Sequence, residues 1–165
     1  MPIYQHDTYD RRVQLGASRR RREDAELLHD TGRWAGAMYL GGYAIECALK
    51  AAICANAGAN DFKETAVYKA GSSGNSLHSL TRLLRELPVI QRSIALDRTK
   101  TYKPAWDVLS SSWQKDELRY WDKKGNQQDS ERFIAAVQAL HVLLLALPIK
   151  SVVLEQLSAL FVHSE

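Results

Sequence analysis

The stretch WAGAMYLGGYAIECALK, residues 34–50, lies in the segment that decides the fold. Apolar residues in and after this stretch recur at intervals of three, four and seven, which places them on one face of an α-helix. Many of the other positions hold alanine or glycine, and such small residues let a neighbouring helix approach closely. The adjacent glycines Gly41 and Gly42 lower helix propensity, so tight packing is the expected compensation. We predict one long central helix over residues 33–57, with Gly58 as its C-terminal stop.

The rest of the chain repeats the helical period and has no stretch of alternating β-branched residues. With 165 residues, 45% hydrophobic and 25% charged, it has the length and composition of one globular domain. We predict an all-α fold: an up-and-down bundle of four to five main helices, with a short C-terminal helix after Pro148. The single domain spans 1–165, with an irregular leader at 1–10 and a helical extension at 148–165. The other predicted helices cover residues 18–30, 76–87, 105–120, 129–147 and 151–162, and a flexible connection lies within 60–75.

Positive charge is concentrated near the start of the chain, although the net charge of +3 and the pI near 8.9 are mild. Arginines that neutralise phosphates release counterions, so this cluster could bind a nucleic acid. A short run of charge is also typical of a solvated helix face. The cluster comprises Arg11, Arg12, Arg19, Arg20, Arg21 and Arg22.

The two cysteines and the apolar segments favour a reducing, aqueous compartment. Cys47 and Cys54 are seven residues apart in the central helix, so their Cα atoms lie about 10.5 Å apart, too far for a disulfide. The start of the chain lacks the charged and apolar regions of a secretory signal. The apolar run at 140–147 is interrupted by His141 and followed by Pro148, which makes it too short to span a bilayer. We therefore expect a cytoplasmic location and no membrane association.

Three sequence motifs occur in order along residues 18–147. The first is the aromatic and small-residue run that leads into Glu46 and Lys50. The second is HSLTRL, residues 78–83, after the flexible connection, and the third is LRYW, residues 118–121. In this order and spacing the motifs resemble those of HEPN domains.

The resemblance implies a bundle of four or five helices that frequently forms a homodimer. In many HEPN proteins the domain cleaves RNA near the dimer interface, and this cleavage needs no metal ion. In other members the domain only binds its partner. Many are encoded beside a minimal nucleotidyltransferase in toxin–antitoxin or defence settings. The resemblance thus implies a homodimer, a minimal nucleotidyltransferase and RNA as partners, and no cofactor.

The ribonuclease members of the family share an Arg followed after four to six residues by His, late in the bundle. Here no histidine follows Arg119 within reach, and eight residues separate Arg132 from His141. The only formal match, Arg22-x6-His29, lies in the first predicted helix. We therefore predict an RNA- or partner-binding domain. The alternative is a metal-independent endoribonuclease that cleaves single-stranded RNA at a dimer-interface site.

If the chain cleaves RNA, we expect Arg119 and His78 to be the catalytic residues, supported by Tyr120. The alternative catalytic pair is Arg22 and His29, which we do not favour. A histidine can move a proton near neutral pH, and a guanidinium can stabilise the charged phosphorane. Arg119 precedes a polar loop, where an RNA backbone could reach it. His78 could equally be a structural histidine bonded to a loop carbonyl.

Glu46 and Lys50 have the i to i+4 spacing of an ion pair, and their apolar surroundings favour a buried structural pair over a functional carboxylate. His141 lies among aliphatic residues, as a core or interface histidine does. Tyr120 and Trp121 belong to an aromatic group with Trp106 and Trp113, for which the core is the default. Beside Arg119, Tyr120 and Trp121 could instead stack on nucleobases. No spacing of His, Cys, Asp and Glu suggests a metal site.

Overall fold

The computed structural model describes the backbone of residues 7–71, 77–121 and 125–161, and the side chains of these residues as far as position 146. Every regular element in these ranges is helical, so the predicted all-α class is confirmed. The elements are α1 (Arg11–Asp30), α2 (Trp34–Asn56), the 3-10 turn η1 (Phe62–Glu64), α3 (Ala66–Ala70), α4 (Leu80–Arg85), α5 (Pro88–Ala95), α6 (Tyr102–Ser112), α7 (Lys115–Tyr120) and α8 (Gln127–Phe161).

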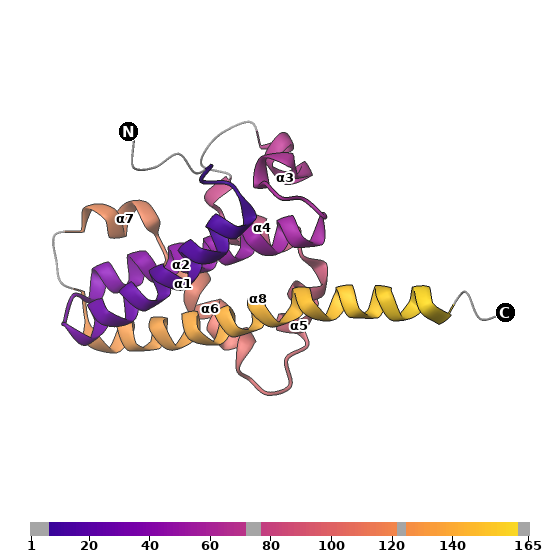
Figure 1. Cartoon of the computed structure of the whole chain (residues 1–165). Helices are drawn as coiled ribbons and strands as arrows, with labels where there is room; N and C mark the ends of the chain where they lie inside the picture. Colours follow the sequence, from indigo (N-terminus) through magenta and orange to yellow (C-terminus); the bar gives the residue numbers. More distant parts are fainter. Residues whose placement is uncertain (1–6, 72–76, 122–124, 162–165) are drawn as a thin grey trace.

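Helix α2 is the centre of the protein, with α1 and α8 alongside it and α4 and α7 against it (Figure 1). Its Ile45 and Leu49 are fully buried. The helix ends close to the predicted position because Gly58 adopts φ +64°, a left-handed conformation that glycine reaches without steric cost. By length and composition α2 is also the one described helix that could cross a membrane, but 83% of its most apolar window is buried inside the protein, as in the core helix of a soluble protein.

The two small residues in the middle of α2 make room for other elements. A Cβ atom at Gly41 would lie 3.2 Å from Phe133 and Val137 of α8, and one at Gly42 would overlap the indole ring of Trp113. The indole Nε1 donates a hydrogen bond of 3.2 Å to the carbonyl oxygen of Tyr39. The compensation expected for two adjacent glycines is therefore close packing with α8 and with one tryptophan.

Helix α1 is longer than predicted, because it begins at Arg11 and not at residue 18. The carboxylate of Asp10 accepts hydrogen bonds from the backbone N–H groups of Arg12 and Val13, at 2.8 and 3.1 Å. This side chain satisfies N–H groups that the first turn of a helix leaves free. The predicted leader thus ends in a helix cap, and its residues 1–6 lie outside the described part of the chain.

The middle of the chain has shorter helices than its periodicity indicates. The connection predicted at 60–75 contains η1 and α3, and its residues 72–75 lie outside the described ranges. The predicted helix 76–87 is reduced to α4, and α5 follows it. The predicted helix 105–120 is divided into α6 and α7. The division falls at Trp113, the residue that turns inward onto Gly42.

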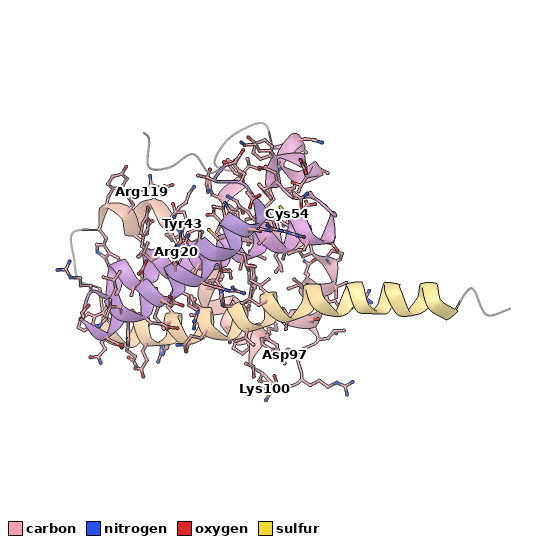
Figure 2. The ribbon with its side chains drawn as sticks, in the orientation of Figure 1. Arg20, Tyr43, Cys54, Asp97, Lys100 and Arg119 are labelled. Carbon is pink, nitrogen blue, oxygen red and sulfur yellow. The ribbon has the colours of Figure 1, made fainter. Side chains whose placement is uncertain are left out.

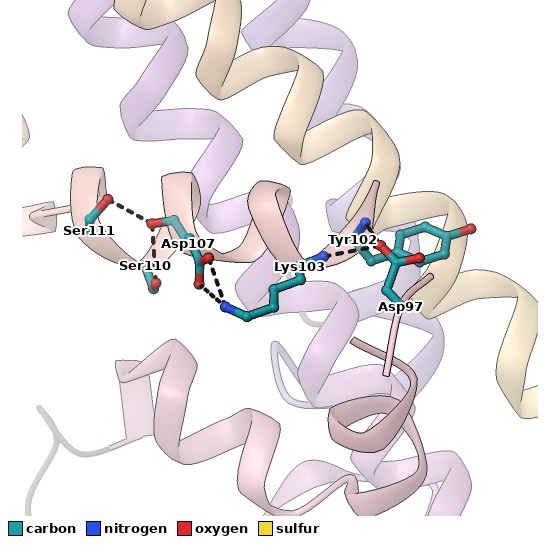
Figure 3. Close-up of polar contacts among 6 residues, drawn as sticks. All are labelled: Asp97, Tyr102, Lys103, Asp107, Ser110 and Ser111. Atoms are coloured by element: carbon teal, nitrogen blue, oxygen red, sulfur yellow. Dashed lines mark hydrogen bonds and ion pairs between the residues drawn. The ribbon is translucent and has the colours of Figure 1, made fainter. Parts of the chain in front are cut away.

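A capped turn connects α5 to α6 (Figure 3). The Asp97 carboxylate accepts hydrogen bonds from the backbone N–H groups of Thr101 and Tyr102, at 2.7 and 2.6 Å. A hydrogen bond from Thr99 and these backbone bonds lower the pKa of Asp97 to about 2. In the first turn of α6, Lys103 pairs with Asp107, which lies one turn further along, at 2.9 Å. Asp97 therefore defines where α6 begins.

Helix α8 continues through Pro148, so the separate C-terminal helix expected at 151–162 is the distal part of one helix, Gln127–Phe161. A proline lacks the backbone N–H that a helix interior uses, so it removes one hydrogen bond, but the helix continues on both sides of Pro148. In Figure 1 the C-terminal end of α8, in yellow, extends beyond the other helices.

Cys47 and Cys54 are both buried and unpaired, as the spacing predicts.

Candidate nucleic-acid interface

Four polar side chains line one face of α2, at Tyr39, Tyr43, Glu46 and Lys50. Their steps of four, three and four residues keep them on one side of a helix. We call these four residues the polar face of α2. Three other segments bring charged or titratable groups to it. These groups are Arg21 of α1, Arg119 of α7 and His78 of the turn before α4.

The guanidinium of Arg119 is attached to the polar face of α2 by two tyrosines. Its Nε donates to the hydroxyl of Tyr39 at 3.1 Å, and its Nη2 donates to the hydroxyl of Tyr43 at 3.2 Å. The two phenol rings meet edge to face, with centroids 5.0 Å apart. These hydrogen bonds raise the pKa of Arg119. The result is a permanently charged group held on the surface by neutral partners.

A second arginine approaches the same pair of tyrosines from α1. The Cζ atom of Arg21 lies 5.6 Å from the centroid of the Tyr43 ring, a cation–π distance. Burial raises the pKa of the Tyr39 phenol, but its hydrogen bonds with Tyr43 and Arg119 and the charges of both arginines outweigh burial and lower that pKa. The Tyr39 hydroxyl therefore lies in a positive potential, whereas burial, the hydrogen bond with Tyr39 and the charge of Glu46 raise the pKa of Tyr43. Sequence analysis named Arg21 only as one member of the N-terminal arginine cluster, and it did not single out Tyr39 or Tyr43, whose only signal was their four-residue spacing.

Tyr120 and Trp121 are surface residues and not part of the core. Tyr120 is 79% exposed and Trp121 is 46% exposed. They line a surface cavity of about 520 Å³ together with Met38, Leu118 and polar side chains that include the carboxylates of Glu117 and Asp129. Of the other aromatic residues in this group, Trp113 is buried and Trp106 packs against the core. The cavity thus offers aromatic surface one and two residues after Arg119.

Glu46, Lys50 and His78 form a second cluster on the polar face of α2. Oε1 of Glu46 lies 2.7 Å from Nζ of Lys50 and 2.8 Å from Nδ1 of His78. Glu46 and Lys50 are each 3% exposed, and Lys50 also lies over the rings of Tyr9 and Phe62. Because a carboxylate only accepts hydrogen bonds, Nδ1 of His78 is the donor and Nε2 remains available. His78 is half-buried and lines a second cavity, of about 440 Å³.

Arg119 and His78 lie on the same face of α2 without bonding to each other. Arg119 is attached at Tyr43 and His78 at Glu46, three residues further along. At 1.5 Å per residue these anchors are about 4.5 Å apart along the helix axis. The structure therefore brings the sequence-predicted pair to one surface, with separate anchors.

The alternative pair, Arg22 and His29, has partners elsewhere. Arg22 pairs with Glu26 of its own helix at 3.0 Å, and Nδ1 of His29 lies 2.8 Å from Oγ of Ser130 in α8. Neither contacts the polar face of α2 among the hydrogen bonds of the described residues. His29 of the formal Arg22-x6-His29 match thus belongs to the contact between α1 and α8, and Arg22 belongs to an ion pair within α1.

His141 is a buried histidine with a hydrogen bond at one ring nitrogen. It is 4% exposed, and its Nε2 lies 2.8 Å from Oγ of Ser18. Burial, together with the charges of Arg22 and Arg19, lowers the pKa of His141 to about 4. The imidazole is therefore neutral at physiological pH and supports the packing of α8 on α1.

Among the residues with described side chains, no group of three or more His, Cys, Asp or Glu could hold a metal ion. Comparisons with protein families, with curated proteins and with solved structures find no match for this chain. The fold and the polar face of α2 therefore define the class: an all-helical domain with a cationic and aromatic surface.

Proposed function

We propose that this chain is a HEPN-like domain that binds single-stranded RNA through Arg119, Tyr120 and Trp121. The observation that carries the proposal is the guanidinium of Arg119, fixed by two tyrosine hydroxyls and followed directly in the chain by two exposed aromatic residues. Proteins that bind single strands combine cations for the phosphates with aromatic side chains for the bases. Arg119 supplies the cation, and Tyr120 and Trp121 supply the rings.

Fluorescence anisotropy with a labelled single-stranded RNA tests this function. We expect Arg119→Ala to weaken binding about tenfold and to reduce the slope of log K against log salt by about 0.7, the value for one phosphate contact on a single strand. Tyr120→Ala should weaken binding by about 1–3 kcal/mol, the range for one base–aromatic stack. Arg98→Ala is the matched control, because Arg98 is an exposed arginine in the α5–α6 connection. Equal Kd values for wild type, Arg119→Ala and Arg98→Ala would refute the proposed interface.

The second candidate function is metal-independent cleavage of single-stranded RNA, favoured by the hydrogen bond between His78 and the buried Glu46. This bond orients the imidazole and leaves Nε2 free to exchange a proton with a ribose hydroxyl. In EDTA, His78→Ala and Arg119→Ala should each lower cleavage about 100-fold, the scale for losing a proton-transfer or charge-stabilising group. RNA that stays intact with the wild-type protein would leave binding as the function.

We also propose that the chain acts as a homodimer in the cytoplasm, with a minimal nucleotidyltransferase as partner in a toxin–antitoxin or defence setting. The HEPN resemblance supports this assignment. Light scattering at micromolar concentration should give twice the mass of 18.6 kDa. A nucleotidyltransferase encoded next to this chain should copurify with it after co-expression; a monomer mass or separate elution would count against the respective partner.

A further inference from the structure

Two arginines from separate helices converge on one tyrosine. Arg119 of α7 donates to the Tyr43 hydroxyl, and Arg21 of α1 lies over the face of the same ring. In the view of Figure 2, Tyr43 and Arg119 lie on the same side of the protein. Because Tyr43 is neutral, it does not balance the positive charge of either guanidinium.

The nearest acidic group on the polar face of α2 is already engaged. Glu46 shares its Oε1 between Lys50 and His78, so its negative charge is balanced locally. None of the salt bridges between described residues includes Arg21 or Arg119. The described part of this cluster therefore holds two positive charges without a paired carboxylate, which fits an anion of charge near −2.

The donors that remain match a tetrahedral oxyanion. A guanidinium has five N–H donors, and Arg119 uses two of its nitrogens on the tyrosine hydroxyls. The rest of its planar fork, together with Arg21, can bind several oxygens of one phosphate group. An internal phosphodiester carries one negative charge, whereas a phosphate monoester carries about −1.5 to −2 near pH 7 and has three free oxygens.

We propose that Arg21 and Arg119 together bind the terminal phosphate monoester of a single-stranded RNA, with Tyr43 holding the two guanidiniums in place. This inference rests on the proposed function and specifies its substrate: an RNA end that carries a phosphate. Tyr120 and Trp121 follow Arg119 directly, so the base of the terminal nucleotide can stack there while its phosphate is bound. The site then distinguishes RNA ends by charge and by the number of free oxygens.

The test measures Kd for one RNA sequence in three forms: with a 5′-phosphate, with a 3′-phosphate and with hydroxyls at both ends. An RNA with two hydroxyl ends and two extra nucleotides controls for total charge. The wild-type protein should bind one of the phosphorylated forms at least tenfold more tightly than the other RNAs. Inorganic phosphate at millimolar concentration should compete with that form more strongly than with the hydroxyl form.

Three variants assign the preference to the two arginines. Arg21→Ala and Arg119→Ala should each reduce the tenfold preference to twofold or less, and Arg21→Lys should retain part of it because the charge stays and the fork is lost. Arg20→Ala removes the same charge from the neighbouring position of α1, where the guanidinium lies against Gly16, and should leave the preference intact. Circular dichroism should show the wild-type helical spectrum for each variant.

Three results overturn the inference in distinguishable ways. If the protein binds all RNA forms equally and Arg119→Ala still weakens binding, internal phosphates are the ligand and only the inference fails. If the protein binds none of the forms, the proposed function fails together with the inference. A preference that survives in both Arg21→Ala and Arg119→Ala would place the phosphate elsewhere.

Discussion

The indole ring of Trp113 occupies the space that a side chain at Gly42 would need. Trp113 also donates its Nε1 hydrogen to the carbonyl of Tyr39, so the contact combines packing with a hydrogen bond. It ends α6, fixes the start of α7 and so positions Arg119 over α2. Stability and the candidate interface depend on the same contact.

Gly42→Ala should therefore destabilise the protein. Its methyl group would displace the Trp113 ring, and overpacking of this kind costs about 1–3 kcal/mol. Gly36→Ala, in the same helix, is the matched control, because its Cβ would meet only Leu28 at 3.4 Å, an ordinary contact. Replacing that glycine should stabilise the helix by about 0.5–1 kcal/mol. Urea unfolding measures both; equal free energies of unfolding would contradict the close contact.

Glu46→Ala should cost about 3–5 kcal/mol in the free energy of unfolding, because it leaves the ammonium of Lys50 buried without its partner. Lys50→Met in the same background removes the orphaned charge and should recover a large part of that loss. Chemical denaturation of the single and double variants measures the coupling. A double variant as unstable as the sum of the two single variants would show that the ion pair contributes nothing specific.

Acid should destabilise the protein through His141. Its pKa is about 4 in the folded protein and about 6.5 in an unfolded chain, so the unfolded state binds the proton more readily between these values. The stability held above pH 6.5 is lost as the pH falls towards 4, by up to about 3 kcal/mol. His141→Gln should flatten this part of the profile of unfolding free energy against pH. A profile with the wild-type slope in the variant would assign the acid sensitivity to other groups.

Asp97→Ala should loosen the beginning of α6, because it leaves the N–H groups of Thr101 and Tyr102 without their acceptor. Hydrogen exchange at these two amides should become faster, and Tm should fall. Since the pKa of Asp97 is lowered to about 2, its contribution is complete above pH 4 and is lost as the pH falls through about 2. Asp107→Ala, which removes only an exposed pair with Lys103, should leave both amides unchanged.

The sequence alone determined the helical class and the place of α2. Its intervals of three, four and seven residues are local properties of the chain, and they require a helix with one buried face whatever the neighbours are. The spacing of Glu46 and Lys50 also determined that these side chains could meet, because residues four apart in a helix lie on one side of it. Local rules were less accurate at the helix ends. Asp10 begins α1 through a cap, and Trp113 divides a predicted helix through a contact with distant Gly42.

Only the tertiary structure decided which groups form the candidate interface. Arg21 and Arg119 are separated by most of the chain, and both lie at Tyr43 because α1 and α7 pack on the same helix. His29 looks like a candidate in the sequence and His141 looks like a core or interface histidine, and each is engaged with a serine where α1 and α8 meet. Helical periodicity specifies which face of a segment is apolar, but it does not specify which segment will cover that face. The rotation and height of each helix on α2 follow from side-chain packing, and they decide which polar groups meet.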